Sequence, residues 1–180
     1  KIGLSQFALD LYARLGQEDD GNLFFSPYSI STALAMTFAG ARGETEREMA
    51  EVLHFAVPQE EIHDAFASVI RSINSDTRTG YQMDVANRLW GQVGHPLRPE
   101  FLTTTRECYG AELVQVDFVR EPEQIRQTIN HWVEEQTQNR IRDLVKKGAI
   151  KSLDRLVLAN AIYFLGDWKS PFKGEKTREA

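Results

Sequence analysis

The side chains most able to do chemistry in this chain of 180 residues do not form a catalytic or metal-binding pattern. The histidines lack the spacing of metal ligands, so surface or packing roles are expected for His54, His63, His95 and His131. Cys108 lies on an apolar helical stripe, where an inert buried thiol is expected rather than a nucleophile. Neither a Gly-x-Ser-x-Gly elbow nor a Gly-x-Gly-x-x-Gly loop is present. We therefore expect no enzyme, no bound metal and no cofactor.

The most informative polar residue is Asn160, which lies in the middle of a long apolar run. Residues 155–168 are rich in branched and aromatic side chains and end in a Gly-Asp turn signal, so they predict a buried strand. A buried amide without hydrogen-bond partners costs roughly 1–3 kcal/mol. Asn160 therefore needs partners, and the best candidates are Ser26 and Ser29 near the start of a helix. A satisfied core amide with a purely structural role is the alternative.

Alternation along this strand separates a bulky face from a small one. The bulky face carries Leu156, Leu158, Asn160, Ile162 and Phe164, and the small face carries Val157, Ala159, Ala161 and Tyr163. We predict that the bulky face is the core side. The small face leaves room for another element to lie close against the sheet.

Apolar spacing and start signals predict six helices that would position these residues, over residues 4–16, 27–39, 45–53, 58–73, 99–109 and 122–139. Ser26 caps the second, with Pro27 in its first turn, and its small or apolar residues all round predict a central position. Thr45 and Glu48 form a capping box for the third. The inward faces are predicted to include Met49, Val52 and Leu53 on the third helix, and Ile62, Phe66, Val69, Ile70 and Ile73 on the fourth.

The strands between these helices do not complete a sheet. Strands are predicted over residues 22–25, 81–92, 111–118 and 155–168. The run around Asn160 is expected to be the central strand, yet it comes late and the chain stops soon after it. Since both edges of a sheet must be covered, the pattern suggests a domain cut in the middle.

Composition limits the classes of partner. Hydrophobic residues make up 42% and charged residues 26% of the chain, which is ordinary for a globular protein. The net charge of −5 argues against nucleic acid, and no apolar run is long enough to cross a membrane. A single cysteine excludes an internal disulfide. The chain opens at Lys1 rather than Met, so we expect a preceding piece that was either removed or not included in this sequence. An extracellular or secreted location is favoured, with an intracellular one left open.

Two long motifs resemble a known family. Residues 22–35 read NLFFSPYSISTALA and residues 40–49 read GARGETEREM, which resembles the opening of the serpins. Residues 158–172, LANAIYFLGDWKSPF, are the second match. Between them, residues 87–90 and 129–133, with Thr137 and Ile141, follow in the family's order. The resemblance covers essentially the whole chain.

The resemblance implies an α+β serpin fold, in which helices pack around a large, mainly antiparallel main sheet. Residues 1–180 would be the N-terminal part of that single domain. The family's inhibitors act once, as suicide substrates of a serine or cysteine protease, by inserting the cleaved reactive loop into the main sheet. The expected partners are therefore a target protease and the missing C-terminal part of the domain. A non-inhibitory serpin with a carrier, chaperone or structural role is the alternative.

The family's functional positions carry over residue by residue. Ser26, Pro27, Ser29 and Asn160 match the shutter that gates opening of the main sheet. Trp168 matches the tryptophan of the breach, where insertion begins. The helix over residues 122–139 matches the one that lies across the sheet, with Ile129, Asn130, Trp132, Val133 and Thr137 among its residues. An ordinary packing helix fits the same sequence.

Other family features are missing or altered in this chain. The reactive loop, its hinge and the neighbouring strand that receives the loop lie downstream of residue 180, so we expect the isolated chain not to inhibit a protease. The hinge sequence would separate an inhibitor from a non-inhibitory serpin.

The helix from Pro58 to Ile73 has an acidic outer face, which argues against the heparin site that regulated serpins carry there. The basic group Arg140, Arg142, Lys146, Lys147 and Lys151 fits a solvated connection or an anionic partner. An enzyme with an unrecognised site would show turnover that depends on His54 or Cys108.

Overall fold

The computed structural model describes residues 3–17, 21–75 and 80–170, which hold six helices and three strands. In chain order they are α1 (Leu4–Leu15), α2 (Pro27–Phe38), α3 (Glu44–Val52), α4 (Gln59–Ile73), β1 (Tyr81–Gln92), α5 (Pro99–Tyr109), β2 (Glu112–Val116), α6 (Pro122–Gln136) and β3 (Leu156–Gly166). All six predicted helices and the three longer strands are present. The last ten residues, which include the end of the second family motif, lie outside the described ranges.

The strands form one mixed sheet in the order β2-β1-β3. β1 pairs with β2 in parallel and with β3 in antiparallel register, and the antiparallel ladder places Asn87 directly opposite Asn160. The prediction that the strand around Asn160 is central was wrong within the described residues, because β1 is central and β3 lies at an edge. Strand order depends on pairing between distant segments, which apolar content alone does not encode.

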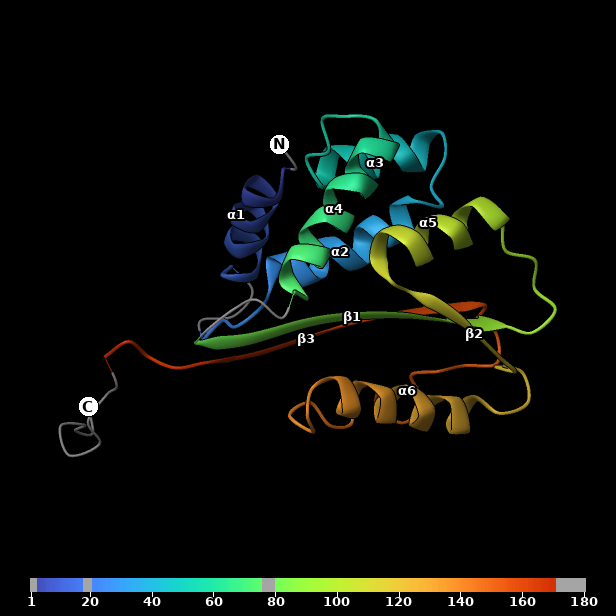
Figure 1. The fold of residues 1–180 in the computed structure, drawn as a ribbon. Coiled ribbons are helices and arrows are strands. Elements are labelled where there is room, and N and C mark those ends of the chain that lie inside the picture. Colours follow the sequence, from blue (N-terminus) through green and yellow to red (C-terminus); the bar gives the residue numbers. More distant parts are fainter. Residues whose placement is uncertain (1–2, 18–20, 76–79, 171–180) are drawn as a thin grey trace.

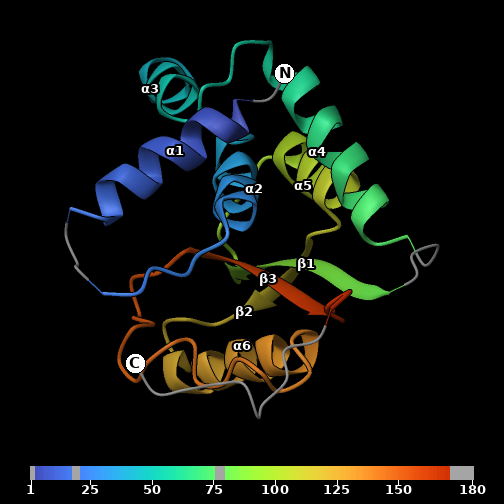
Figure 2. The ribbon, with the colours of Figure 1, turned by 90° about the vertical axis from the view of Figure 1, so that its left-hand side faces the viewer.

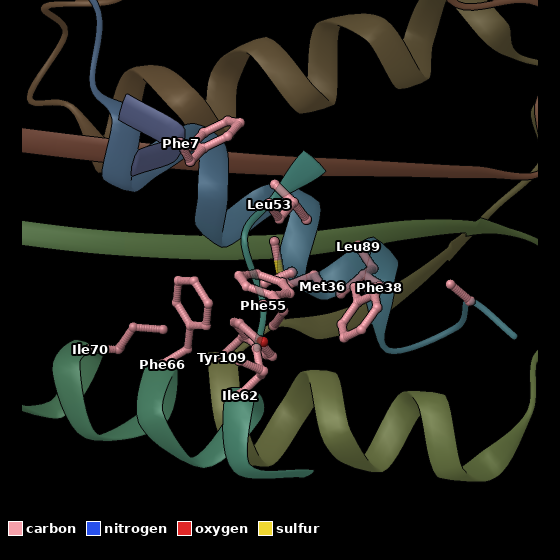
Figure 3. Close-up of a cluster of buried hydrophobic side chains, with 13 residues drawn as sticks. Phe7, Met36, Phe38, Leu53, Phe55, Ile62, Phe66, Ile70, Leu89 and Tyr109 are labelled. Carbon is pink, nitrogen blue, oxygen red and sulfur yellow. The ribbon is translucent and has the colours of Figure 1, made fainter. Parts of the chain in front are cut away.

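The sheet separates two hydrophobic cores. Helices α1–α5 lie on one face of the sheet, and α6 covers the other (Figures 1 and 2). The larger core, shown in Figure 3, gathers aromatic and aliphatic side chains around Met36, Phe66 and Tyr109. The smaller core lies between the sheet and α6, around Trp90 and Ile129. Each large apolar side chain that is fully buried in these cores contributes about 1.5–3 kcal/mol.

Helix α2 occupies the middle of the larger core, as its all-round apolar sequence predicted. Ser26 caps it by accepting a hydrogen bond from the Ser29 N–H at 3.2 Å, and Pro27 occupies its first position. Proline is suited to that position because its missing N–H would have no helical partner there. Ala35 and Met36 are fully buried. The start of α2 is therefore fixed both by its cap and by the core around it.

Three local predictions were wrong. The third helix begins at Glu44 after Gly43, whose φ of 62° only glycine adopts readily, so Thr45 does not cap it. Val52 and Val69 were placed inward but are 65% and 36% exposed. Val52 is the last residue of α3, and the side chain that turns into the core there is Leu53 instead.

The two faces of β3 are also buried differently from the prediction. Ala161 and Tyr163, on the small face, are its buried residues, whereas Phe164 on the bulky face is 65% exposed. Helix α6 covers the small face, while the larger core reaches only the first half of the bulky face, at Leu156 and Leu158. The strand predicted over residues 22–25 is not formed, since these residues have no regular secondary structure and no sheet partner among the described residues, and Phe24 is 100% exposed.

Candidate functional site

A row of hydrogen bonds joins the start of α2 to the two long strands. The Ser29 hydroxyl donates to Asn160 Oδ1, and Asn160 Nδ2 donates to Asn87 Oδ1 at 2.7 Å. We call these three residues, Ser29, Asn160 and Asn87, the seam. Both ends of the half-buried Asn160 amide are satisfied in this way. The predicted contact between Asn160 and the start of α2 is therefore confirmed.

Local structure explains why these side chains meet. The Ser26 cap and Pro27 set the first turn of α2, and Ser29 in that turn presents its hydroxyl to β3. Asn160 and Asn87 are paired across the antiparallel ladder, where directly opposed side chains point to the same face. Ser26 and Pro27 thus position the seam through the backbone, and neither of their side chains bonds Asn160.

Asn87 was not recognised as a site residue from the sequence. It is 6% exposed, and its Nδ2 donates to the main-chain oxygen of Tyr109 at 2.8 Å. The signal was the same as for Asn160, since an asparagine within the apolar stretch of β1 also needs partners. The Tyr109 carbonyl could not have been found, because no side-chain type marks a main-chain acceptor.

A groove runs beside the seam along the outer edge of β3. Its volume is about 810 Å³, and its walls include Phe25, Ile30, Ile141 and Phe164 together with Ser29 and Asn160. No strand of the described residues pairs with this edge of β3. The seam therefore lies where a sheet ends, next to a largely apolar hollow.

Of the five residues assigned to the sheet-covering helix, three pack against the sheet and two form hydrogen bonds with main-chain groups. Ile129, Trp132 and Val133 are buried in the smaller core, and the Trp132 ring meets Trp90 edge-on at 5.3 Å between centroids. Asn130 instead bonds the main chain of Val145, and the Thr137 hydroxyl donates to the Val133 carbonyl and accepts from the Ile141 N–H. These two residues hold the chain that leaves α6 rather than the sheet.

Trp168 is not brought to the seam. Its side chain is 71% exposed just beyond the end of β3, where it lines a pocket with Tyr81 and Phe164. Its assignment to the breach rests on the family resemblance and stays a prediction.

The remaining chemistry-bearing residues do not form a second site. Burial lowers the pKa of His63 to about 4, and Arg42 contributes in the same direction. Burial raises the pKa of the half-buried Cys108 thiol, which disfavours the thiolate. Among the described residues, no three His, Cys, Asp or Glu side chains gather as a metal site requires. None of the described helices combines the length and apolar character that a membrane crossing needs.

Comparison with known proteins identifies one family along nearly the whole chain. The family model described as "Serpin (serine protease inhibitor)" matches residues 3–180. The leukocyte elastase inhibitor of Bos taurus is 48% identical over 177 residues, which are 98% of this chain and 46% of that protein. That of Homo sapiens is 43% identical over 177 residues, again 98% of this chain and 46% of that protein. The chain thus spans about half the length of the curated relatives it matches.

Solved structures extend the likeness to the fold. Ovalbumin from the emu, Dromaius novaehollandiae, has a TM-score of 0.89 at 30% identity, with 99% of this chain and 49% of that chain covered. The structure named "Cleaved Serpin 42Da" has a TM-score of 0.88 at 34% identity, with 97% and 46% covered. The predicted α+β fold of helices around a sheet is confirmed. The chain belongs to the serpin family.

Proposed function

We propose that the protein containing this chain inhibits serine proteases as a single-use suicide substrate whose cleaved reactive loop inserts into the main sheet. The family description and the relatives named as leukocyte elastase inhibitors support an inhibitor rather than an enzyme. An elastase-like serine protease is the proposed target, with a cysteine protease as the alternative. By the family resemblance the loop lies outside residues 1–180, and this chain would supply part of the sheet that accepts it.

The observation that carries the proposal is the seam at the outer edge of β3. A strand can add to a sheet only where an edge is free or can be freed, and β3 presents such an edge beside the groove. The hydrogen bond between Ser29 and Asn160 ties this edge to the buried helix α2. Such a hydrogen bond contributes about 0.5–1.5 kcal/mol net, so it can tie β3 to α2 and still be broken when the sheet opens.

The same groove supports a role for the rest of the domain as a partner of this chain. Phe24, Leu144 and Phe164 line the groove and are 100%, 50% and 65% exposed. Contiguous apolar surface of this kind is typical of an interaction site. We propose that the C-terminal part of the domain covers it and supplies the strand beside β3.

A covalent-trapping assay tests the function. The full-length protein is mixed with leukocyte elastase and separated by denaturing electrophoresis. We expect a complex that survives denaturation, because the protease serine stays acylated by the cleaved loop. Elastase whose catalytic serine has been blocked is the control and should give no such complex. Cleavage of the protein by active elastase without any complex would contradict inhibition and favour the non-inhibitory alternative.

A further inference from the structure

The hydrogen bonds of the seam continue into the helical core. Ser29 donates to Asn160, Asn160 donates to Asn87, and Asn87 donates to the main-chain oxygen of Tyr109 at 2.8 Å. Each donor therefore points the same way, from the start of α2 across β3 and β1 to the end of α5. Hydrogen bonds aligned in this manner polarise one another, so a change at one end reaches the other.

The end of α5 fixes this direction. Tyr109 is the last residue of α5 and Gly110 follows it in the left-handed conformation, with φ of 64°. The carbonyls of a helix's last turn lack helical partners and carry partial negative charge. Because a carbonyl can only accept, Asn87 must offer it the amide nitrogen and turn its own oxygen to Asn160. Flipping either amide would set two acceptors face to face.

Tyr109 is held in place from its other end. Its ring is 1% exposed, and its hydroxyl lies 2.6 Å from Nδ1 of His63 on α4. The two rings meet edge-on at 5.6 Å, and the Phe66 ring lies 5.8 Å from that of Tyr109. His63 is itself 5% exposed, and its Nε2 has no partner among the described residues. Tyr109 therefore links a buried imidazole to the seam.

We propose, building on the function proposed for the seam, that His63 and Tyr109 are positioning residues of the seam. His63 fixes Tyr109, the Tyr109 carbonyl orients the amides of Asn87 and Asn160, and acid loosens β3 at Asn160 by protonating His63.

The effect of acid follows from the donors of the imidazole ring. A neutral ring carries one N–H and a protonated ring carries two, but only Nδ1 faces a partner. The charged groups acting on His63 are Arg42, between α2 and α3, which opposes protonation, and Asp64 on α4, which favours it. Tyr109 of α5 is the titratable group in contact with the ring. Protonation thus adds a buried charge and makes both ring nitrogens donors, although only Nδ1 faces a partner among the described residues.

The direction in which pH changes the loosening of β3 follows from how many protons His63 binds before and after loosening. With Tyr109 and the ring packed as in the structure, the pKa of His63 is about 4, whereas a form in which β3 is loosened and the ring meets water would return the pKa toward 6.5. The packed form therefore binds fewer protons, and acid favours the loosened form. Loosening should grow as pH falls from 6.5 toward about 4.

Hydrogen exchange on the full-length protein tests this link without any protease. Protection factors of the β3 amides around Asn160 are measured across this pH range, with α6 amides as the internal reference. We expect β3 protection to fall on acidification in the wild type. Tyr109→Phe, which keeps the ring, should lower β3 protection about five- to tenfold at neutral pH, as expected for one lost hydrogen bond. His63→Leu and Tyr109→Phe should both remove the pH dependence at β3.

His95→Gln is the matched control, because it removes an exposed histidine far from the seam in sequence and should keep the wild-type pH response. An unchanged pH response in His63→Leu would overturn the proposal. Equal loss of protection in α6 and β3 would also overturn it, by showing a general structural role. A protein that shows the response but never traps elastase would contradict the proposed function alone.

Discussion

At the scale of single residues, Asn160 matters because both ends of its amide are used. Removing it would leave the Ser29 hydroxyl and the Asn87 oxygen without their present partners. The cost of such a change comes more from the orphaned groups than from the lost bond itself. A single substitution at Asn160 therefore leaves two other polar groups of the seam without their partners.

Asn160→Ala is expected to destabilise the full-length protein by roughly 1–3 kcal/mol and to speed its heat-induced polymerisation, because the sheet edge loses its tie to α2. Thermal unfolding and the rate of polymer formation measure the two effects. Ser29→Ala provides a double-mutant cycle: once Asn160 is gone, Ser29→Ala should cost less than it does in the wild type. Additive effects together with an unchanged polymerisation rate would argue against the seam as a gate.

His63 should make the free energy of unfolding depend on pH. Its pKa is about 4 when folded and 6.5 ordinarily, so the unfolded chain binds more protons between these values. Stability therefore falls as pH drops from 6.5 to about 4, by at most about 3 kcal/mol from this residue. Urea unfolding of the full-length protein and of His63→Leu across this range measures the difference. Parallel pH profiles for the two proteins would show that another group is responsible.

Asn160 could be found from the sequence because an amide in an apolar run demands a partner. Asn87 also lies in a strand and also needs hydrogen-bond partners. Only the pairing of the two strands shows that Asn87 and Asn160 are partners of each other. The Tyr109 carbonyl and the buried His63 ring depend on the packing of α4 against α5, which no local pattern encodes. Two of the three seam residues, Ser29 and Asn160, were thus predicted from the sequence.

At the scale of elements, α6 is attached to the molecule on two sides. Its apolar stripe packs on the sheet, while Asn130 and Arg126 hold the chain that follows the helix. Asn130 brackets Val145, donating to its carbonyl at 3.0 Å and accepting from its N–H at 2.8 Å. Arg126 donates to the same carbonyl at 2.8 Å. The helix and the connection to β3 therefore behave as one layer over the sheet.

Asn130→Ala should release this connection. The Val145 N–H would lose its acceptor, at a cost of about 1–3 kcal/mol if it stays out of water. We expect faster limited proteolysis within residues 137–155 and a lower urea midpoint. His131→Ala is the matched control on the same helix, because the His131 side chain is 74% exposed and its surface contact with Glu135 contributes little. Equal cleavage rates in the two variants would show that Asn130 does not hold the connection.

Elements with local signals were predicted best. Ser26 and Pro27 define the start of α2, and the bounds predicted for β1, residues 81–92, match the structure. Predictions failed where the outcome depends on distant partners, as at β3, which lies at an edge. They also failed at Val52, where the last turn of a helix leaves the direction of the next side chain undetermined.

At the scale of the molecule, one sheet carries a core on each face and ends at an edge that no described strand covers. The apolar groove lies along this edge, with Phe24 fully exposed in its wall. An uncovered edge next to apolar surface is a template for pairing with another chain. The uncovered edge and the groove therefore predict that residues 1–180, without the rest of the domain, associate with one another.

Residues 1–180 expressed alone should self-associate and should not trap a protease. Self-association follows from the free edge of β3 and the groove. In the full-length protein, the C-terminal part of the domain is proposed to cover both. Trapping should be absent because the family resemblance places the reactive loop outside these residues. Light scattering and denaturing electrophoresis after mixing with elastase measure the two outcomes, with the full-length protein as the reference. A monomeric chain would show that the β3 edge does not drive self-association. A denaturation-resistant complex would place the trapping segment within these 180 residues.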